Sequence, residues 1–285
     1  MIEQLSKIID KTKISKEDQV QIDAAFEHFY EMLPTGEDPW GLNLKKARKN
    51  LEFIYPIYKK YFKVRVFGQE HVEDRPYIVT SNHTGQIAID GMLIATAFAT
   101  EIKPQRILRA MVERFFTGLP FLGMWAQEGG AVLGDRQNCI NLLNKGHSVL
   151  VFPEGVRGVS KSTPDFYKLQ KFTRGFFRMS LQTKTPILPV AVVGAEEVFP
   201  YVYQAKDLAK KLGLPALPIS ANYFPLPSPI DIHIGKEYQV PQDVSFDSPD
   251  KVIDEHIYKI ESEIKKLVES GLKQRREFWA NQKSE

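Results

Sequence analysis

The sequence contains one cysteine, no excess of charge of either sign and no long apolar run. Cys139 is the one cysteine among 285 residues, which excludes an intramolecular disulfide and a multi-cysteine zinc or iron–sulfur site. A lone thiol of this kind fits a reducing compartment. The 38 Lys and Arg against 35 Asp and Glu leave a net charge of +3, so the overall charge indicates no nucleic-acid partner.

A helix that spans a bilayer needs about 20 predominantly apolar residues, and the sequence offers none. The best candidate, Ile87–Ala99, is shorter and contains Asp90. The chain begins Met1-Ile2-Glu3-Gln4, without a basic segment followed by an apolar run, so we expect no secretory signal peptide. The expected location is therefore cytoplasmic.

The composition is that of an ordinary folded protein, with 43% hydrophobic and 26% charged residues. At about 150 residues per domain, the length predicts two units or one large domain with an extension. The pattern favours a helical extension over residues 1–62 and an α/β domain over residues 63–285.

The helical extension has two predicted segments. Ser15 and Asp18 form a capping box before an amphipathic stretch that stops at Pro34. The second segment, Leu42–Phe62, interleaves lysines and aromatics, and Pro56 is expected to kink it.

From Val64 onward, short β-rich runs alternate with helical stretches, which predicts a mostly parallel or mixed central sheet flanked by helices. The Pro-rich stretch Leu212–Ile230 reads as an irregular loop, and an amphipathic helix from Val252 follows it. The predicted strands are Val64–Phe67, Tyr77–Ser81, Arg106–Met111, Ala131–Leu133, Ser148–Phe152, Ile187–Val193 and Ile230–Ile234, and the helices between them are Ile89–Thr100, Val112–Trp125, Gln137–Lys145 and Phe172–Lys184.

The first candidate functional segment contains His83 and Asp90, just after a predicted strand and at the start of the next helix. This is the carboxyl edge of the sheet, where ligands bind in open α/β proteins. A carboxylate that accepts from one imidazole nitrogen leaves the other nitrogen able to take a proton. Taken alone, such a pair also fits an ordinary loop histidine and a helix-capping aspartate.

Three further segments follow in order. Gly130 to Arg136 places an Arg just after a strand, where it can meet an anion, although this segment taken by itself favours a turn with a solvated Arg. Phe152-Pro153-Glu154-Gly155-Val156-Arg157 ends a buried strand in a turn that presents a carboxylate and a guanidinium. Ile187 to Val190 contains Pro189, which by itself indicates an edge strand.

Together these four blocks, spread over Tyr77 to Val193, resemble the glycerolipid acyltransferase family, whose best-known members are the lysophosphatidic acid acyltransferases. Two departures stand out. The family usually has four residues between its His and Asp, whereas six separate His83 from Asp90, and Ala88 occupies the usual acidic position. We expect the turn at Gly85 to bulge so that Asp90 still reaches His83; the alternative is a histidine without its carboxylate. Val156 stands where the family usually has a hydroxyl residue.

The resemblance implies transfer of a fatty acyl group from acyl-CoA or acyl carrier protein to a hydroxyl, with no metal or redox cofactor. His83 is then the general base and Asp90 holds its ring. Backbone amides near Gly155 or in the Asn82–Thr84 turn are the candidate oxyanion donors. The acceptor's phosphate is expected near Arg136, Arg157 and the turn formed by Phe152, Pro153, Glu154 and Gly155, with Glu154 binding acceptor hydroxyls or supporting Arg157.

The favoured acceptor is lysophosphatidic acid. Glycerol 3-phosphate, another lysophospholipid, a neutral alcohol such as diacylglycerol, and a catalytically inactive lipid-binding relative are the alternatives. The basic and aromatic stretches Leu42–Phe62 and Phe166–Phe177 suggest peripheral association with an anionic membrane surface on its cytoplasmic face. The alternative is that their aromatic residues pack on the sheet and their charges are solvated.

Overall fold

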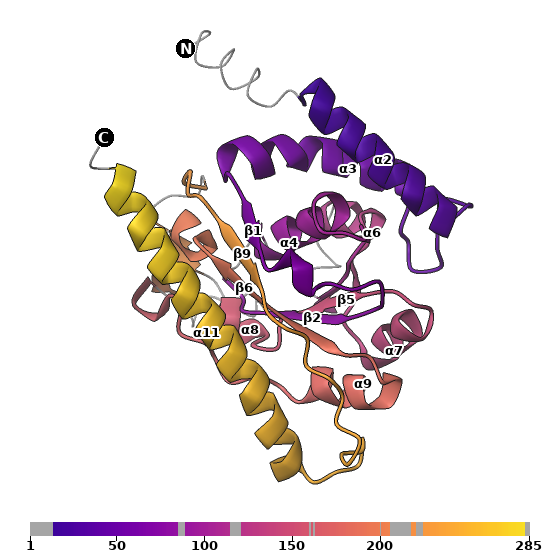
Figure 1. Cartoon of the computed structure of the whole chain (residues 1–285), viewed down its shortest axis with the longest axis vertical. Coiled ribbons are helices and arrows are strands. Elements are labelled where there is room, and N and C mark those ends of the chain that lie inside the picture. The colour runs from indigo at the N-terminus through magenta and orange to yellow at the C-terminus, as the bar shows by residue number, and fades with distance from the viewer. Residues whose placement is uncertain are drawn as a thin grey trace.

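A seven-stranded mixed sheet with helices on both faces organises the protein (Figure 1). The structure, a computed structural model, describes residues 14–84, 89–114, 121–159, 161, 163–199, 201–205, 218–220 and 225–282. The strand order is β1-β9-β6-β2-β5-β3-β4. Its strands are β1 (Arg65–Phe67), β2 (Ile78–Ser81), β3 (Arg109–Val112), β4 (Val132–Leu133), β5 (Val149–Val151), β6 (Ile187–Val193) and β9 (Asp231–Ile234).

Five neighbouring strands, β6, β2, β5, β3 and β4, are parallel, so their carboxyl ends share one edge of the sheet. Strand β9 is antiparallel to β6 and pairs in parallel with β1. All seven strands of this sheet overlap the predicted ones, and the predicted α/β class is confirmed.

The helices cover the sheet in two layers, α2, α3 and α4 on one face and α7, α9 and α11 on the other (Figure 1). The long yellow helix α11 crosses the sheet diagonally. The main helices are α2 (Lys16–Met32), α3 (Leu44–Pro56), α4 (Ile89–Thr100), α6 (Leu122–Glu128), α7 (Arg136–Asn144), α8 (Val156–Val159), α9 (Gly175–Thr183) and α11 (Asp250–Gln282).

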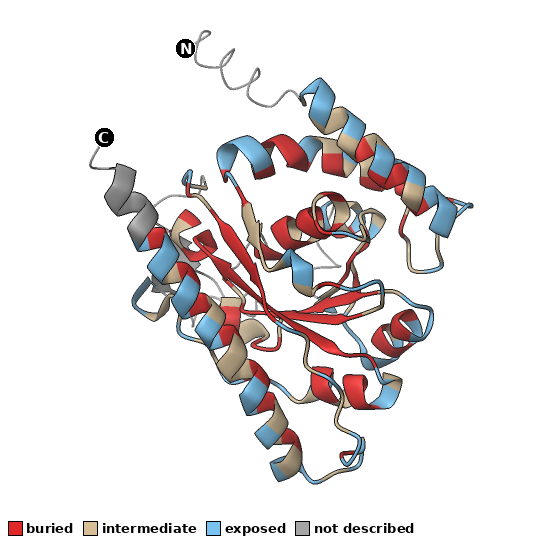
Figure 2. Ribbon diagram, in the orientation of Figure 1, coloured by how far each residue is buried: buried red, intermediate tan, exposed pale blue. Residues whose placement is uncertain are grey.

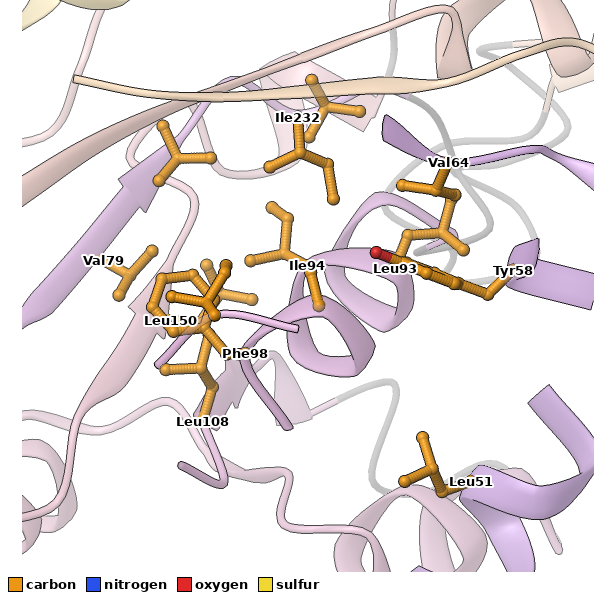
Figure 3. Close-up of a cluster of buried hydrophobic side chains, with 14 of the residues drawn as sticks. Leu51, Tyr58, Val64, Val79, Leu93, Ile94, Phe98, Leu108, Leu150 and Ile232 are labelled. Atoms are coloured by element: carbon orange, nitrogen blue, oxygen red, sulfur yellow. The ribbon is translucent and has the colours of Figure 1, made fainter. Parts of the chain in front are cut away.

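Two buried cores lie on the two faces, because successive residues of a strand point to opposite sides. In β5, Leu150 contributes to the core under α4, whereas Val149 and Val151 contribute to the core under α9 and α11. In Figure 2 the strands β2, β5, β6 and β9 are red along their length, as expected of strands covered on both faces, whereas the outer strand β1 is tan. Figure 3 shows the first core, where Ile94 and Phe98 of α4 point toward Val79 and Leu150 of the sheet.

The helical N-terminal part is packed onto the sheet. Buried side chains of α2 and α3, among them Ile22 and Leu51, belong to the same core as the strand residues Val79 and Ile232. The Ser15 side chain accepts from the Asp18 amide at the start of α2, as the capping box predicts. The predicted boundary between residues 62 and 63 therefore runs through a shared core.

The second predicted helix changes character at Pro56. Helix α3 ends there, and a π-helical turn, Ile57–Tyr61, continues it. Proline lacks the amide hydrogen that an α-helical bond at this position needs, which accounts for the change of hydrogen-bonding pattern.

Three sequence predictions need correction. The predicted helix Val112–Trp125 is wrong at both ends, because Val112 pairs with Leu133 in the sheet and α6 continues to Glu128. Part of the predicted loop Leu212–Ile230 forms strand β8 (Pro218–Ser220), which pairs antiparallel with β7 (Tyr201–Gln204). The edge position suggested by Pro189 is also wrong, since β6 lies between β2 and β9.

Candidate functional site at the carboxyl edge of the sheet

The candidate site lies where β2 and β5, neighbours in the sheet, both end. His83 comes two residues after β2, and Phe152 directly follows β5. Since the two strands are parallel, both segments leave the sheet at the same edge. The order of the strands thus brings together two blocks that are about 70 residues apart in the sequence.

Asn82 holds the exit from β2. Its side-chain amide donates to the Val192 carbonyl at 3.0 Å, and its side-chain oxygen accepts from the Val192 amide at 2.8 Å. The side chain thereby occupies both main-chain groups of one residue of β6, and it is fully buried. This double contact fixes the chain immediately before His83.

The imidazole of His83 is hydrogen-bonded to Asp90. The distance from His83 Nδ1 to Asp90 Oδ2 is 2.6 Å, so the contact expected despite the long spacing is present. Residues 85–88, where the bulge was predicted, lie outside the described residues. The same carboxylate accepts from the amides of Thr84 at 2.8 Å and Gly91 at 2.7 Å.

Asp90 is buried, yet its environment favours the ionised form. Burial by itself raises the pKa of the carboxyl group, but the charge of His83, the bond from its ring and the two backbone donors outweigh burial and lower the pKa. An ionised Asp90 accepts a hydrogen bond, so Nδ1 of His83 carries the proton. Nε2 is then the basic nitrogen of the ring.

Phe152 supports the ring from one side. The two ring centroids are 4.1 Å apart at an interplanar angle of 15°, a stacked arrangement. A Cβ on Gly91 would lie 3.4 Å from the Phe152 ring, so a small residue at position 91 leaves room for this aromatic side chain. Phe152 therefore restricts the rotation of the imidazole.

Glu154 holds the main chain of His83. One carboxylate oxygen accepts from the His83 amide at 2.9 Å, and the other accepts from the Gln170 amide at 2.7 Å. The side chain is also paired with Lys161, with 3.1 Å between Nζ and Oε2. These contacts differ from the predicted support of Arg157, because the carboxylate is directed toward His83.

Lys161 and Glu196 belong to this site and were missed by the sequence analysis. The ammonium group of Lys161 donates to the His83 carbonyl at 3.1 Å and to Glu196 at 3.2 Å. Glu196 follows β6 at the same sheet edge, a position that is only a weak signal in the sequence, whereas Lys161 lies outside the described helices and strands. Burial raises the pKa of Glu196 to about 7, although Lys161 acts in the opposite direction.

Two glycines shape the turn after β5. Gly155 has a φ of +56°, a left-handed conformation that disfavours a side chain. A Cβ on Gly158 would lie 2.7 Å from the Cβ of His83 and 2.9 Å from that of Glu154. Gly158 therefore lets helix α8 approach the histidine.

Three of the predicted oxyanion donors are already engaged inside the protein. The amide of His83 donates to Glu154, the amide of Thr84 to Asp90, and the amide of Gly155 to the Phe152 carbonyl at 3.0 Å. These three amides hold the geometry of the site.

The two arginines named in the sequence analysis occupy different surroundings. Arg157 is exposed on α8 and donates to the Lys171 carbonyl at 2.7 Å. Arg136, at the start of α7, donates to Gln182 at 2.8 Å and lies over the ring of Phe246, 4.1 Å from its centroid. Arg157 is thus next in the chain to Gly158, which touches His83, whereas Arg136 is held against α9.

The aromatic residues of the two segments expected at a membrane surface are mostly internal. In the first segment Tyr55, Tyr58 and Phe62 are buried, while Phe53 is 69% exposed. The aromatic residues of the second segment that are fully inside the core are Phe172, Phe176 and Phe177. Within the described part of the chain, no helix combines the length and apolar character needed to cross a bilayer.

The chain is similar to known acyltransferases. A family model described as Acyltransferase matches residues 63–193, which include all four blocks. An uncharacterized protein of Mycobacterium tuberculosis is 34% identical over 230 residues, which are 78% of this chain and 63% of that protein. The chain thus matches less than two thirds of the length of this relative.

Two further similarities are to proteins that are named for an activity. The 1-acyl-sn-glycerol-3-phosphate acyltransferase of Saccharomyces cerevisiae is 31% identical over 140 residues, or 45% of this chain and 42% of the yeast protein. The crystal structure of the 1-acyl-sn-glycerophosphate (LPA) acyltransferase of Thermotoga maritima superposes with a TM-score of 0.53 at 19% identity, covering 79% of each chain. This structural similarity supports the fold.

Proposed function

Because the chain belongs to the glycerolipid acyltransferase family through its residues 63–193, we propose that it transfers a fatty acyl group from a thioester to the hydroxyl of a lysophospholipid, with lysophosphatidic acid as the first candidate. The observation that carries this proposal is the hydrogen bond between His83 and the buried Asp90 at the carboxyl edge of the sheet. The donor is acyl-CoA or acyl carrier protein.

In the proposed reaction His83 is the general base. A hydroxyl is a weak nucleophile at neutral pH, so Nε2 of His83 removes its proton as the oxygen attacks the thioester carbonyl carbon. Asp90 stabilises the imidazolium that forms and keeps Nδ1 protonated. General base catalysis of this type accelerates a reaction by roughly 10²–10⁴-fold.

The tetrahedral intermediate then collapses. The carbon–sulfur bond breaks, the carbonyl re-forms, and the thiolate leaves and takes up the proton that His83 holds. The products are an ester and a free thiol, and the histidine returns to its starting state. Each atom and proton is accounted for, so the step needs no metal or redox cofactor as a co-reactant.

Arg157 is the first candidate for the acceptor phosphate. Its guanidinium is exposed on α8, and the next residue, Gly158, packs against His83. A guanidinium can hold a phosphate through two parallel hydrogen bonds. Arg136 remains a second candidate, at a larger cost, because it must first leave Gln182 and Phe246. Phe152, Pro153 and Gly155 form the wall and turn beside which the acceptor lies.

We also propose that the protein approaches its lipid substrate at an anionic membrane surface. The exposed side of α3 carries Lys45, Lys49 and Phe53. On the neighbouring helix α6, which packs against α3, Met124 is 58% exposed. Phe121, which directly precedes this helix, is 84% exposed. Apolar side chains among lysines are typical of surfaces that enter the headgroup region. We assign membrane contact to these exposed residues of α3 and α6, because most of the aromatic residues that the sequence suggested for this contact are buried.

The test is an acceptor panel. The purified protein is incubated with labelled acyl-CoA or acyl carrier protein and, separately, with lysophosphatidic acid, another lysophospholipid, glycerol 3-phosphate and diacylglycerol, and products are identified by mass spectrometry. The proposal predicts acylated lysophosphatidic acid as the main product. Preference for diacylglycerol would overturn the phosphate assignment, and binding without any product would indicate an inactive lipid-binding relative.

A further inference from the structure

A buried cluster of charges surrounds the main chain of His83. The side chains of Lys161, Glu154 and Glu196 are 4%, 0% and 0% exposed. Buried charges are costly unless they are paired and hydrogen-bonded, so a cluster of this kind needs a reason to be there. Each of its members is within hydrogen-bonding distance of another.

Glu154 and Lys161 hold the two polar main-chain groups of His83. The carboxylate of Glu154 accepts the His83 amide at 2.9 Å, and the ammonium of Lys161 donates to the His83 carbonyl at 3.1 Å. The two side chains are themselves paired at 3.1 Å. The ion pair therefore forms a closed clamp around one residue, and that residue carries the imidazole.

The position of Lys161 fits support of His83 better than contact with substrate. Its ammonium has three donors, and among the described residues the acceptors within reach are the His83 carbonyl, Glu154 and Glu196. The side chain is only 4% exposed. A substrate phosphate would have to displace a buried carboxylate to reach it.

We propose that Lys161 is a positioning residue for His83, which acts by clamping the His83 main chain together with Glu154. This inference rests on the proposed function, since it assigns Lys161 a role through the proposed base. The ring is oriented by Asp90 and Phe152, but these contacts act on the side chain alone. Lys161 fixes the point from which the side chain projects.

The expected effect is on turnover. A base displaced by about 1 Å can lower a rate about 100-fold, so Lys161→Met should lower kcat by about 10- to 100-fold and leave KM within about 2-fold. Lys161→Arg keeps a cation and donors, and should recover most of the lost kcat. Lys168→Met is the matched control, because Lys168 is 65% exposed and pairs with Asp165 on the surface.

A second variant keeps the test decisive if Lys161→Met does not fold. Removal of one partner of a buried ion pair is strongly destabilising. The double variant Lys161→Met with Glu196→Gln is assayed above pH 7, where Glu196 is ionised, so it removes one positive and one negative charge and leaves the net charge of the cluster unchanged. It should show the same loss of kcat as Lys161→Met.

The clamp also predicts non-additive effects. In an Asp90→Asn background the imidazole is already poorly held, so Lys161→Met should cost less than it does in the wild type. Folding of every variant is checked by thermal unfolding. Wild-type kcat in folded Lys161→Met or in the double variant, or a loss confined to KM, would overturn the inference. No turnover by the wild type on any acceptor would instead overturn the proposed function.

Discussion

Asp90 is the residue whose environment says most about the chemistry of the site. It is fully buried, accepts from His83 and from two backbone amides, and its pKa is lowered despite burial. Asp90→Asn should lower kcat by about 10²–10⁴-fold, because an amide can donate to Nδ1 and so favour the wrong tautomer. Steady-state kinetics with the surface variant Asp247→Asn as control measures this. A change confined to KM would remove Asp90 from the catalytic pair.

Glu196 should make the free energy of unfolding depend on pH. Its pKa in the folded protein is raised from 4.5 to about 7. A carboxyl group with a raised pKa stabilises the fold below its unfolded pKa, and this contribution is lost as the pH rises toward 7. Glu196→Gln cannot ionise, so its free energy of unfolding relative to the wild type should increase between about pH 4.5 and 7, by an amount on the order of 1–3 kcal/mol.

Denaturant unfolding at several pH values measures this difference. A difference that stays constant over the window would contradict the raised pKa of Glu196. Sequence reasoning did not identify this residue, because a single acid after a strand is common. Glu196 is significant because it is buried and accepts a hydrogen bond from Lys161. Lys161 lies 35 positions earlier in the chain, and no sequence motif indicated it.

Among the elements, the turn after β5 controls how close α8 comes to His83. Gly158→Ala places a Cβ 2.7 Å from the Cβ of His83 and should lower kcat at least about 10-fold by moving the histidine. Gly155→Ala is the matched variant. Among the described residues, none beyond its chain neighbours comes within 4 Å of its Cβ, so its cost is backbone strain at φ +56°, about 1–2 kcal/mol of unfolding free energy, with a smaller loss of kcat than in Gly158→Ala.

Both variants are compared by kcat and by thermal unfolding. Equal losses of kcat in the two would show that the loss reflects strain in the turn and not contact with His83. The comparison separates the two reasons for which a turn contains glycine, a left-handed φ at Gly155 and a close approach at Gly158.

The strands were predictable because short apolar runs rich in β-branched residues, placed between helical segments, favour buried strands. The position of β6 was not, because Pro189 removes an amide hydrogen and so suggests an edge. Pro189 lies one residue before the start of the ladder with β9, and its carbonyl accepts from the Gly235 amide at 2.9 Å. The ladder hydrogen bond that Pro189 cannot donate would therefore lie beyond the end of β9. Only the register of the two strands shows this.

At the scale of the whole molecule, the N-terminal helices and the sheet share one core and one buried ion pair. Arg109 of β3 is fully buried, pairs with Asp38 in the segment between α2 and α3, and donates to the Gly130 carbonyl at 3.0 Å. Asp38→Ala leaves this buried charge uncompensated and should cost about 3–5 kcal/mol of unfolding free energy. Denaturant unfolding measures the loss, and a value near that of the exposed control Asp247→Asn would contradict the role of the pair.

The sequence blocks that form the candidate site could be predicted, but the contacts that their side chains make could not. His83, Asp90 and Phe152 were named from sequence and lie together, because strand order brings the ends of β2 and β5 side by side. Arg136 was expected near the same place, but its side chain turns toward Phe246 and Gln182. A motif fixes where a residue leaves the sheet, whereas the direction of a long side chain depends on neighbours distant in sequence.

The central claim is that His83 is the base of an acyl transfer. The most direct measurement is the initial rate of lysophosphatidic acid acylation by the wild type, His83→Ala and the surface variant His28→Ala, with labelled acyl thioester and equal folded protein. The account predicts a loss of at least about 100-fold in His83→Ala and an unchanged rate in His28→Ala. Undiminished acylation by His83→Ala would contradict it.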